Sequence, residues 1–439
     1  MPERTDAGGD RVAAWLLASV SALAVVGEMV PAWPDWVTGA ICWAACGMLW
    51  HKVKPLQRRV IALLLAFGTA GVAAGTLAGH SGFFTRALTQ NLPLVGMLIA
   101  VSFLQLIGAQ PGPGDETLPR GRGALFRTLI GVHLFGAVIN YSAVAIFADR
   151  LSARARLTLD QAAALSQSFI IGAVWSPFYG AMAVALTFAP QASLTRLMCI
   201  GLPVALLGLL ISWLTLSSSR HGRAREFAGY PLRPEALWLP SALVVAVLLI
   251  HELQPAWPVL AIITLTAPIL TALTLLVRDG GLTGAALRRV IDVRLPEMGG
   301  EMALFMSAGV LSAGMAGAVA AFELGLPFSH FGATEAGYTA TAMTLAAWLG
   351  FHPVILGMVV GPWIAQLNPD PNLLAMSLLM PWAIGLTACP LGNTILAVHA
   401  RYQIPTRALL NRNRVFSAQM LLLSLVVLQI YERVAIAWP

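Results

Sequence analysis

Oxygen-bearing side chains stand beside helix-breaking residues at two places in the chain. One stretch, GAVWSPFYGAMAVAL, begins at Gly172, and the other, GLTACPLGNTILAV, begins at Gly385. Proline and glycine interrupt the helical hydrogen-bond ladder in both. The second half of an interrupted helix starts with free backbone N–H groups, which bind anions. Each serine or threonine hydroxyl has the alternative of bonding back to its own helix. The candidate ligands for a small anionic substrate are Ser168, Ser176, Pro177, Tyr179, Gly180, Thr387, Pro390, Gly392, Asn393 and Thr394.

A second group of polar residues lies inside or beside apolar spans and could couple transport to a proton. His133 and Asn140 are seven residues apart and share a helical face. An imidazole, with a pKa of about 6.5, can carry a proton or donate to a carboxylate, and packing through interhelical hydrogen bonds is its alternative role. A buried carboxylate can also couple proton movement, whereas a solvated one is an ordinary surface group. The coupling candidates are His133, Asn140, Glu301, Glu335 and His352.

The elements that must position these residues are membrane-spanning helices. Apolar residues make up 58% of the 439 positions, charged residues only 11%, and the mean hydropathy is +0.76. A soluble domain is about one-quarter charged. Apolar runs of about 20 residues, enough to cross a hydrocarbon core, recur from residue 11 to residue 435. The segments between them are too short for a soluble catalytic, nucleotide-binding or nucleic-acid-binding domain. We therefore expect an all-α integral membrane protein surrounded by the lipid bilayer.

Eleven crossings are expected, together with two interrupted stretches at about 161–190 and 371–400. Broken backbone at membrane depth is tolerated only where it is buried in protein or lines a wet cavity. We expect each interrupted stretch to be a re-entrant helical hairpin, with a single kinked crossing helix as the alternative. The expected crossings are 11–32, 36–51, 58–79, 88–109, 125–147, 193–217, 237–252, 256–277, 297–322, 337–366 and 413–435.

Arginine-rich loops predict the orientation. The net charge is +7, and the basic residues sit in short loops, which indicates orientation rather than nucleic-acid binding. Only Lys52 and Lys54 are lysines, as is typical of a GC-rich genome, and we expect the inner membrane of a bacterium. With the spans above, five basic loops fall on the cytoplasmic side, whereas ADRLSARAR at 148–156 falls outside and violates the rule. The five loops are 51–59, 120–123, 220–227, 288–294 and 401–414.

The two interrupted stretches indicate an internal repeat. Gly172 to Pro177 superposes on Gly385 to Pro390 at an offset of 213 residues. The order of spans around them also repeats, and the two halves enter the membrane from opposite sides. Inverted repeats with broken helices near the midplane are typical of secondary transporters. The expected organisation is N-terminal helices at 1–57, a first repeat at 58–220 and a second repeat at 221–439.

The element order, the paired hairpins and the residues Gly392, Asn393 and Thr394 resemble the ion transporter superfamily. This group includes divalent-anion/sodium symporters, arsenite permeases and the large membrane subunits of TRAP transporters. The resemblance covers roughly residues 58–435. It implies an elevator-type transporter, a homodimer, a first hairpin on the cytoplasmic side and a substrate site between two hairpin tips.

Members similar to the divalent-anion symporters carry Ser-Asn-Thr at both tips, where oxygens hold sodium and a substrate carboxylate. Asn393 and Thr394 match two of these residues, which implies an Na+ site near them. The first interrupted stretch lacks the Asn-Thr pair, so the coupling ion implied is Na+ or H+. No other cofactor is expected.

The sequence thus predicts a secondary active transporter of a small, carboxylate-like anion rather than an enzyme. It contains no Walker A, HExxH, nucleophile-elbow or GxGxxG pattern. A cation/proton antiporter is one alternative, and it needs a membrane-buried carboxylate. An intramembrane enzyme acting on a lipid carrier is another, and it needs Asp, His or Arg clustered at one membrane face.

Overall fold

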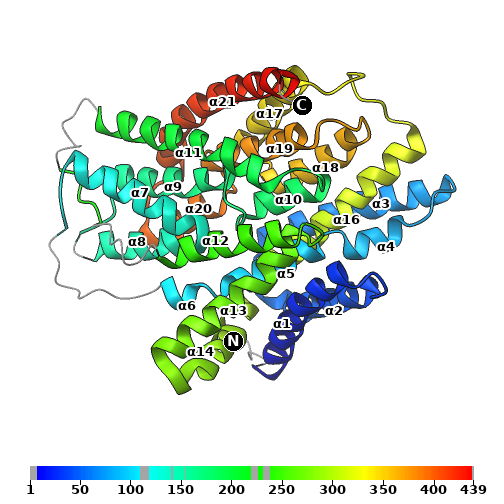
Figure 1. Ribbon diagram of the computed structural model, residues 1–439, viewed down its shortest axis with the longest axis horizontal. Helices are drawn as coiled ribbons and strands as arrows, with labels where there is room; N and C mark the ends of the chain where they lie inside the picture. The colour runs from blue at the N-terminus through cyan, green and yellow to red at the C-terminus, as the bar shows by residue number, and fades with distance from the viewer. Residues whose placement is uncertain are drawn as a thin grey trace. The chain divides into compact units, whose positions relative to one another are not determined.

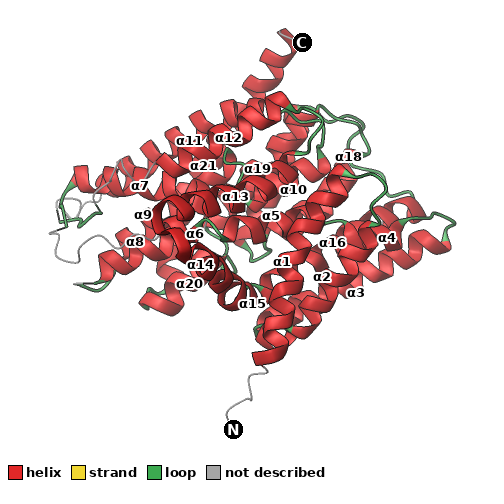
Figure 2. Ribbon diagram, turned by 60° about the horizontal axis from the view of Figure 1, so that its bottom comes forward, coloured by secondary structure: helices red, strands yellow, loops and turns green. Residues whose placement is uncertain are grey.

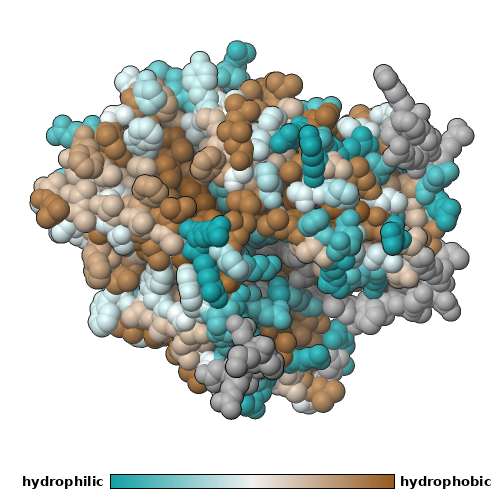
Figure 3. Space-filling model, turned by 180° about the vertical axis from the view of Figure 1, so that it is seen from behind, coloured by the Kyte–Doolittle hydropathy of each residue, from teal (hydrophilic) through white to brown (hydrophobic). Residues whose placement is uncertain are grey.

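All elements of the computed structural model are helices in the residues that it describes (Figures 1 and 2). These are residues 7–108, 118–139, 142–153, 155–218, 226–230 and 238–437. Eight helices in these ranges are long and apolar enough to cross a membrane. Large apolar side chains are exposed on many of them, for example Leu77 and Val277, and hydrophobic residues cover much of the left side of the view in Figure 3. The chain is a multi-pass membrane protein, which confirms the expected fold class.

The chain packs into two compact units, each assembled from distant segments. Unit 1 comprises residues 1–107, 243–327 and 358–363, and unit 2 comprises residues 108–242, 328–357 and 364–439. These units are therefore distinct from the three consecutive segments expected from the sequence, which describe repeats rather than packing.

Unit 1 contains mostly uninterrupted helices. Its elements are α1 (Ala7–Met29), α2 (Asp35–Met48), α3 (Pro55–Leu77), α4 (Phe83–Thr89), α5 (Leu92–Ser102), α6 (Gln105–Gly108, at the boundary), α13 (Val259–Asp279), α14 (Thr283–Arg289), α15 (Leu295–Glu297) and α16 (Gly299–Phe322), with α12 (Trp238–Leu253) and α18 (Pro353–Ala365) shared between the units.

Helices α3 and α16 form the most extensive helix pairing in unit 1. Glycines let their backbones touch, because a Cβ added at Gly71 would overlap the backbone of Gly314. Likewise, a Cβ at Gly317 would meet the Gly71 carbonyl. Small residues at such an interface allow the close van der Waals packing that drives helix association in lipid.

Two acidic residues of unit 1 pair with basic side chains from segments that are distant in the sequence. Asp10 on α1 forms ion pairs with Lys52 at 2.9 Å and with His51 at 3.1 Å. Asp292 pairs with Arg11 and Arg288 and accepts a hydrogen bond from Trp15. The basic loops at 51–59 and 288–294 therefore both lie beside the N-terminal end of α1, as the positive-inside pattern predicts.

Unit 2 contains two sets of five helices in the same order. The first set is α7 (Arg122–Ile139), α8 (Ser142–Ser152), α9 (Leu159–Ile170), α10 (Gly180–Phe188) and α11 (Leu194–Ser217). The second set is α17 (Ala333–Trp348), the shared α18, α19 (Pro371–Thr387), α20 (Asn393–Tyr402) and α21 (Thr406–Ala437).

The stretch expected as a crossing at 125–147 is instead a re-entrant pair, α7 and α8. The two helices pack on each other. The chain enters α7 next to Phe227, whose carbonyl accepts the Gly121 N–H at 3.0 Å. It leaves α8 next to Tyr230, whose ring lies 4.8 Å from the Arg150 guanidinium. Both ends of the pair thus lie at the same end of unit 2, which we call the arginine end.

The stretch expected as a crossing at 337–366 also turns back. Ala333, at the start of α17, donates its N–H to Glu432 at 2.8 Å. Asp370, which follows α18, accepts from the Tyr431 hydroxyl at 2.9 Å. Tyr431 and Glu432 are neighbours on α21, so the chain leaves from and returns to one place. We call this place, defined by Asp370, Tyr431 and Glu432, the far end.

The stretches expected as hairpins at 161–190 and 371–400 are interrupted crossing helices. At the start of α9, Asp160 pairs with Arg412 at the arginine end. After α10, the Ser193 N–H bonds to Asn372 beside the far end. Asn372 lies in the first turn of α19, and α20 ends where Arg401 pairs with Asp149 at the arginine end. The hairpin positions were therefore wrong, and the kinked-crossing alternative describes these stretches.

Because the re-entrant pairs and the crossing helices have exchanged places, the 148–156 loop no longer violates the positive-inside rule. With α7 and α8 turning back, the 148–156 loop lies at the arginine end together with the loops at 120–123 and 401–414. The two five-helix sets run in opposite directions, because α9 leaves the arginine end and α19 leaves the far end. The inverted repeat is thus present within unit 2.

We expect Gly71→Ala to destabilise the protein by about 1–3 kcal/mol, because the new methyl group overlaps the backbone of α16. Gly47→Ala on α2 is the matched control, since its added Cβ meets nothing within 4 Å. Thermal unfolding in detergent would measure both. Equal melting temperatures for the two variants would contradict the close packing of α3 on α16.

We expect cysteines placed at Gly123 and Ala153 to react with a membrane-impermeant maleimide from the same side of the membrane. A cysteine at Gln191, between α10 and α11, should react from the opposite side. Right-side-out and inverted vesicles, on a background without the native cysteines, would measure this. Labelling of positions 123 and 153 from opposite sides would restore a single crossing at 125–147.

Candidate functional site

The two interrupted helices of unit 2 pack against each other in opposite directions (Figure 1). The first half of each contacts the second half of the other, α9 with α20 and α10 with α19. Matched glycines lie near the ends of the two first halves: Gly172 follows α9 and its carbonyl accepts from Trp175 N, and Gly385 lies in the last turn of α19 and its carbonyl accepts from Ala388 N. The sequence repeat of 213 residues is therefore also a structural repeat. The first interruption is buried, whereas the second reaches the surface at Asn393.

His133 on α7 supports the first interruption. The Trp175 indole N–H donates to His133 Nε2 at 3.0 Å. Because an indole nitrogen only donates, Nε2 is the accepting nitrogen and Nδ1 carries the proton. Nδ1 then donates to the Ser168 carbonyl at 3.1 Å. Both ring nitrogens of this buried histidine are engaged, so in this structure His133 holds α9 and the interruption together.

The other predicted ligands of the first interruption are also tied to backbone groups. The Ser176 hydroxyl bonds to the Ala137 carbonyl of α7, and it accepts from Phe178 N at 3.3 Å. The Tyr179 hydroxyl donates to the Phe169 carbonyl at 2.6 Å, and the Ser168 hydroxyl to the Ala164 carbonyl at 2.5 Å. These side chains fix the shape of the interruption. Pro177 lies inside it, and Gly180 begins α10.

The second interruption presents a freer amide. Asn393 is exposed at the start of α20, and its side chain has no hydrogen-bond partner within the described residues. Thr394 beside it is buried. Gly392 is the N-cap of α20 and Pro390 lies two residues before it, while the Thr387 hydroxyl bonds back to the Ile384 carbonyl at 2.6 Å. Asn393 and Thr394 were expected at a hairpin tip and instead lie in an interrupted crossing helix.

The N-termini at the two interruptions differ from those at the ends of unit 2. α9 begins with a capping box, α19 is capped by Asp370 and α11 by Ser193. By contrast, Tyr179 before α10 and Gly392 before α20 provide no side-chain cap. The backbone N–H groups of Gly180, Ala181 and the first residues of α20 have no partner among the described residues. Helix starts whose N–H groups have no partner are potential anion sites.

The remaining coupling candidates lie in other surroundings. Asn140 is outside the described residues. Glu335 accepts from Gly332 N at 2.9 Å and caps α17. His352 Nδ1 accepts from Val354 N at 3.2 Å and caps α18, with its ring edge-on to Trp382. Glu301 lies in the first turn of α16 in unit 1, so it is in a different unit from the interruptions.

A buried carboxamide chain behind the interruptions was absent from the sequence predictions. Gln167 on α9 donates to Asn413 on α21 at 2.9 Å, and Asn413 donates to the Thr387 carbonyl at 2.8 Å. Gln167 lies one residue before the predicted ligand Ser168. Asn413 stands in NRNR, which has the composition of a loop. Only the proximity of Gln167 to the first interruption was a signal in the sequence.

No acidic side chain of unit 2 lies at the interruptions within the described ranges. Asp149 and Asp160 form ion pairs at the arginine end. At the far end, Glu335 caps α17, Asp370 caps α19 and accepts from Tyr431, and Glu432 accepts from Ala333 N. The described residues also contain no group of three His, Cys, Asp or Glu side chains that could hold a metal ion. Backbone N–H groups and Asn393 are thus the main polar groups available there.

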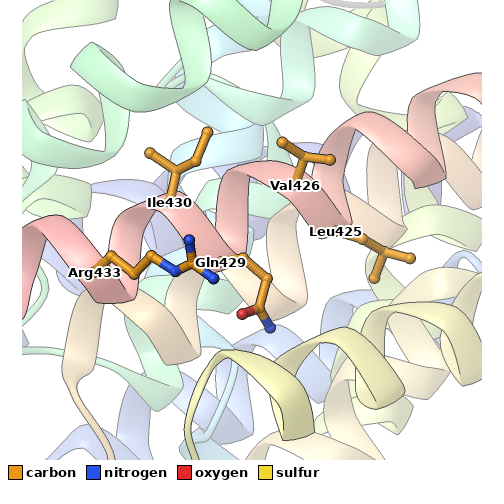
Figure 4. A pocket seen from close by; sticks show the side chains of 5 residues that line it. All are labelled: Leu425, Val426, Gln429, Ile430 and Arg433. Atoms are coloured by element: carbon orange, nitrogen blue, oxygen red, sulfur yellow. The ribbon is translucent and has the colours of Figure 1, made fainter.

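An open depression of about 330 Å³ lies on the surface of α21 rather than at the interruptions (Figure 4). It is lined by Leu425, Val426, Gln429, Ile430 and Arg433, all from that one helix. Val426 and Ile430 are exposed, so this is an outer face of unit 2.

Comparison with known proteins gives likenesses among solved structures only. No protein-family model and no curated protein matches the chain. Among solved structures, the chain is similar to the YdaH transporter of Alcanivorax borkumensis, whose crystal structure is described as revealing an unusual topology. The identity is 16%, the TM-score is 0.41, and the match covers 87% of this chain and 85% of that one. A likeness at this level does not assign the chain to a family.

We expect His133→Leu to destabilise unit 2 by about 1–3 kcal/mol, because it leaves the Trp175 indole and the Ser168 carbonyl without partners. His133→Gln should lose less, because an amide can both accept and donate at this position. Thermal unfolding in detergent, followed by tryptophan fluorescence, would compare them. A His133→Leu protein as stable as the wild type would show that the histidine does not hold the interruption.

Proposed function

We propose that this chain is a secondary active transporter of a small anion, which binds where the two interrupted helices of unit 2 pack together. The observation that carries this proposal is the pair of helix N-termini without a side-chain cap at the two interruptions, those of α10 and α20. The helix dipole and free N–H groups favour a negative charge at both places. A carboxylate or a small oxyanion fits this chemistry without an arginine ligand.

The distribution of acidic residues supports an anion over a cation. Every described carboxylate of unit 2 with an assigned partner lies at the arginine end or the far end, as an ion pair or a helix cap. A cation/proton antiporter needs a carboxylate inside the membrane that can exchange its proton. The interruptions offer amide, hydroxyl and backbone N–H groups instead.

The division into two units supports a moving-carrier mechanism. Unit 2 holds the α7–α8 pair and both interrupted helices, whereas unit 1 is built on the close α3–α16 packing. In our proposal unit 2 carries the anion across the membrane while unit 1 is the scaffold, as in an elevator-type transporter. This architecture fits the resemblance to the ion transporter superfamily, and a homodimer in a bacterial inner membrane belongs to the same proposal.

The coupling ion in this proposal is Na+ or H+. Asn393 and Thr394 offer oxygens to Na+ at the start of α20. His133 has both nitrogens engaged, and Glu335 and His352 cap helices, so a proton route through any of them requires a rearrangement of these bonds.

Counterflow of labelled succinate and other carboxylates in proteoliposomes tests the function directly. Counterflow without an ion gradient should require unlabelled substrate on the opposite side, and net uptake should require an imposed Na+ or H+ gradient. The proposal fails if neither gradient supports uptake of any carboxylate or oxyanion by folded, reconstituted protein.

We expect Asn393→Ala to weaken anion binding roughly tenfold, since a hydrogen bond to a charged group contributes about 1.5–3 kcal/mol. Its melting temperature should stay unchanged, because the Asn393 side chain has no hydrogen-bond partner within the described part of the chain. Asn411→Ala, an exposed asparagine at the arginine end of α21, is the matched control. Counterflow kinetics would measure both, and unchanged transport in Asn393→Ala would place the anion elsewhere.

A further inference from the structure

A chain of buried hydrogen bonds connects three helices of unit 2 with the second interruption. The Ser212 hydroxyl on α11 donates to Gln167 Oε1 at 2.7 Å, and Gln167 Nε2 donates to Asn413 Oδ1 at 2.9 Å. Asn413 Nδ2 then donates to the Ser166 hydroxyl at 3.1 Å and to the Thr387 carbonyl at 2.8 Å. Asn413 is 0% exposed and Gln167 is 1% exposed.

The chemistry of its last acceptor fixes the direction of this chain. A carbonyl only accepts, so Asn413 must point its nitrogen at Thr387 and its oxygen at Gln167. Gln167 must then donate to Asn413, which leaves its own oxygen for Ser212. Every link depends on the one before it, and a single change at Gln167 leaves Asn413 Oδ1 buried without a donor, which is costly.

The chain connects the two helices that lead into the interruptions, α9 and α19. Thr387 is the last residue of α19. One turn further along α21, Ser417 donates to the Ile384 carbonyl at 2.8 Å, so α21 holds the final turn of α19 at two points. On α9, Gln167 directly precedes Ser168, whose carbonyl is bound by His133.

We propose that Gln167 and Asn413 form a positioning pair that keeps the two interruptions in register, so that both uncapped helix starts serve one anion. The second part rests on the function proposed above. Neither residue needs to touch the anion. Their role is to transmit the position of α9 to the end of α19.

Cys389 is a native reporter for this coupling. It lies in the second interruption, is 0% exposed, and directs its Sγ to the Phe351 carbonyl at 3.8 Å. The other cysteines, Cys42, Cys46 and Cys199, can be replaced so that Cys389 is the only thiol. Its rate of modification by N-ethylmaleimide then reports whether the second interruption opens.

The decisive variant is Gln167→Met, which is close to isosteric and lies on α9, away from Cys389 in the sequence. We expect it to accelerate Cys389 modification roughly fivefold, as residues in one hydrogen-bond network are coupled. Asn413→Leu should do at least the same. The double variant should react no faster than Asn413→Leu alone, because Gln167 acts through Asn413.

Asn372→Leu is the matched control. Asn372 is a buried amide of unit 2, but it accepts from Ser193 N near the far end. It should lower the melting temperature without accelerating Cys389 modification. If Gln167→Met lowers the melting temperature in the same way and leaves the Cys389 rate unchanged, the pair is only structural and the proposal is overturned. Independent, additive effects of the two single variants would overturn it as well.

A milder variant covers the case in which Asn413→Leu does not fold. Ser212→Ala removes only the first hydroxyl of the chain and should accelerate Cys389 modification by less than Gln167→Met does. An unchanged rate of Cys389 modification in both Ser212→Ala and Gln167→Met would show that the pair does not couple the two interruptions.

Succinate counterflow separates this inference from the function on which it rests. In Gln167→Met the KM for succinate should rise several-fold, whereas in Asn372→Leu it should stay at the wild-type value. If the wild-type protein transports no anion, the proposed function fails, and the Cys389 measurements still decide whether the pair couples the interruptions. An unchanged KM in Gln167→Met, with wild-type transport intact, would contradict the role in the anion site.

Discussion

The need to satisfy backbone N–H and C=O groups away from water governs unit 2. Two helices stop and restart within it, and a polar group that is buried there without a partner costs several kcal/mol. The carbonyls that end α9 and α19 are satisfied by His133, Ser417 and Asn413. The N–H groups that begin α10 and α20 have no comparable side-chain partners. This imbalance between satisfied carbonyls and free N–H groups gives the interior of unit 2 a preference for negative charge.

The supporting side chains explain why so many polar residues occur in an apolar protein. Ser176 and Tyr179, which the sequence suggested as ligands, bind backbone carbonyls of α7 and α9. Their loss would disturb the shape of the interruption before it affected any ligand. Asn393 differs from them because it is exposed and its amide is unoccupied within the described residues. Polar side chains thus stabilise the backbone at the first interruption, whereas at the second the Asn393 amide is available to a ligand.

Sequence analysis located the interruptions but misjudged what the chain does on either side of them. Proline and glycine act locally, so Gly172 to Pro177 and Gly385 to Pro390 could be recognised directly. Whether a chain turns back or continues depends on contacts between distant segments, such as Arg150 with Tyr230. The basic loop at 148–156 was the one available signal, because a single crossing at 125–147 places this loop outside, against the positive-inside rule. Gln167 and Asn413 could not be found in this way, because they are far apart in the sequence and no local pattern indicates that they bond to each other.

The two re-entrant pairs have the same topology but are fastened by different chemistry. The α7–α8 pair is held at the arginine end by the Asp149–Arg401 ion pair, whose side chains are 44% and 60% exposed. The α17–α18 pair is held at the far end by hydrogen bonds from Ala333 N to Glu432 and from Tyr431 to Asp370. Exposed ion pairs are weakened by dissolved salt far more than hydrogen bonds to backbone groups are. The contacts of the α7–α8 pair therefore weaken more in salt than those of the α17–α18 pair, so the two halves of the inverted repeat are fastened unequally.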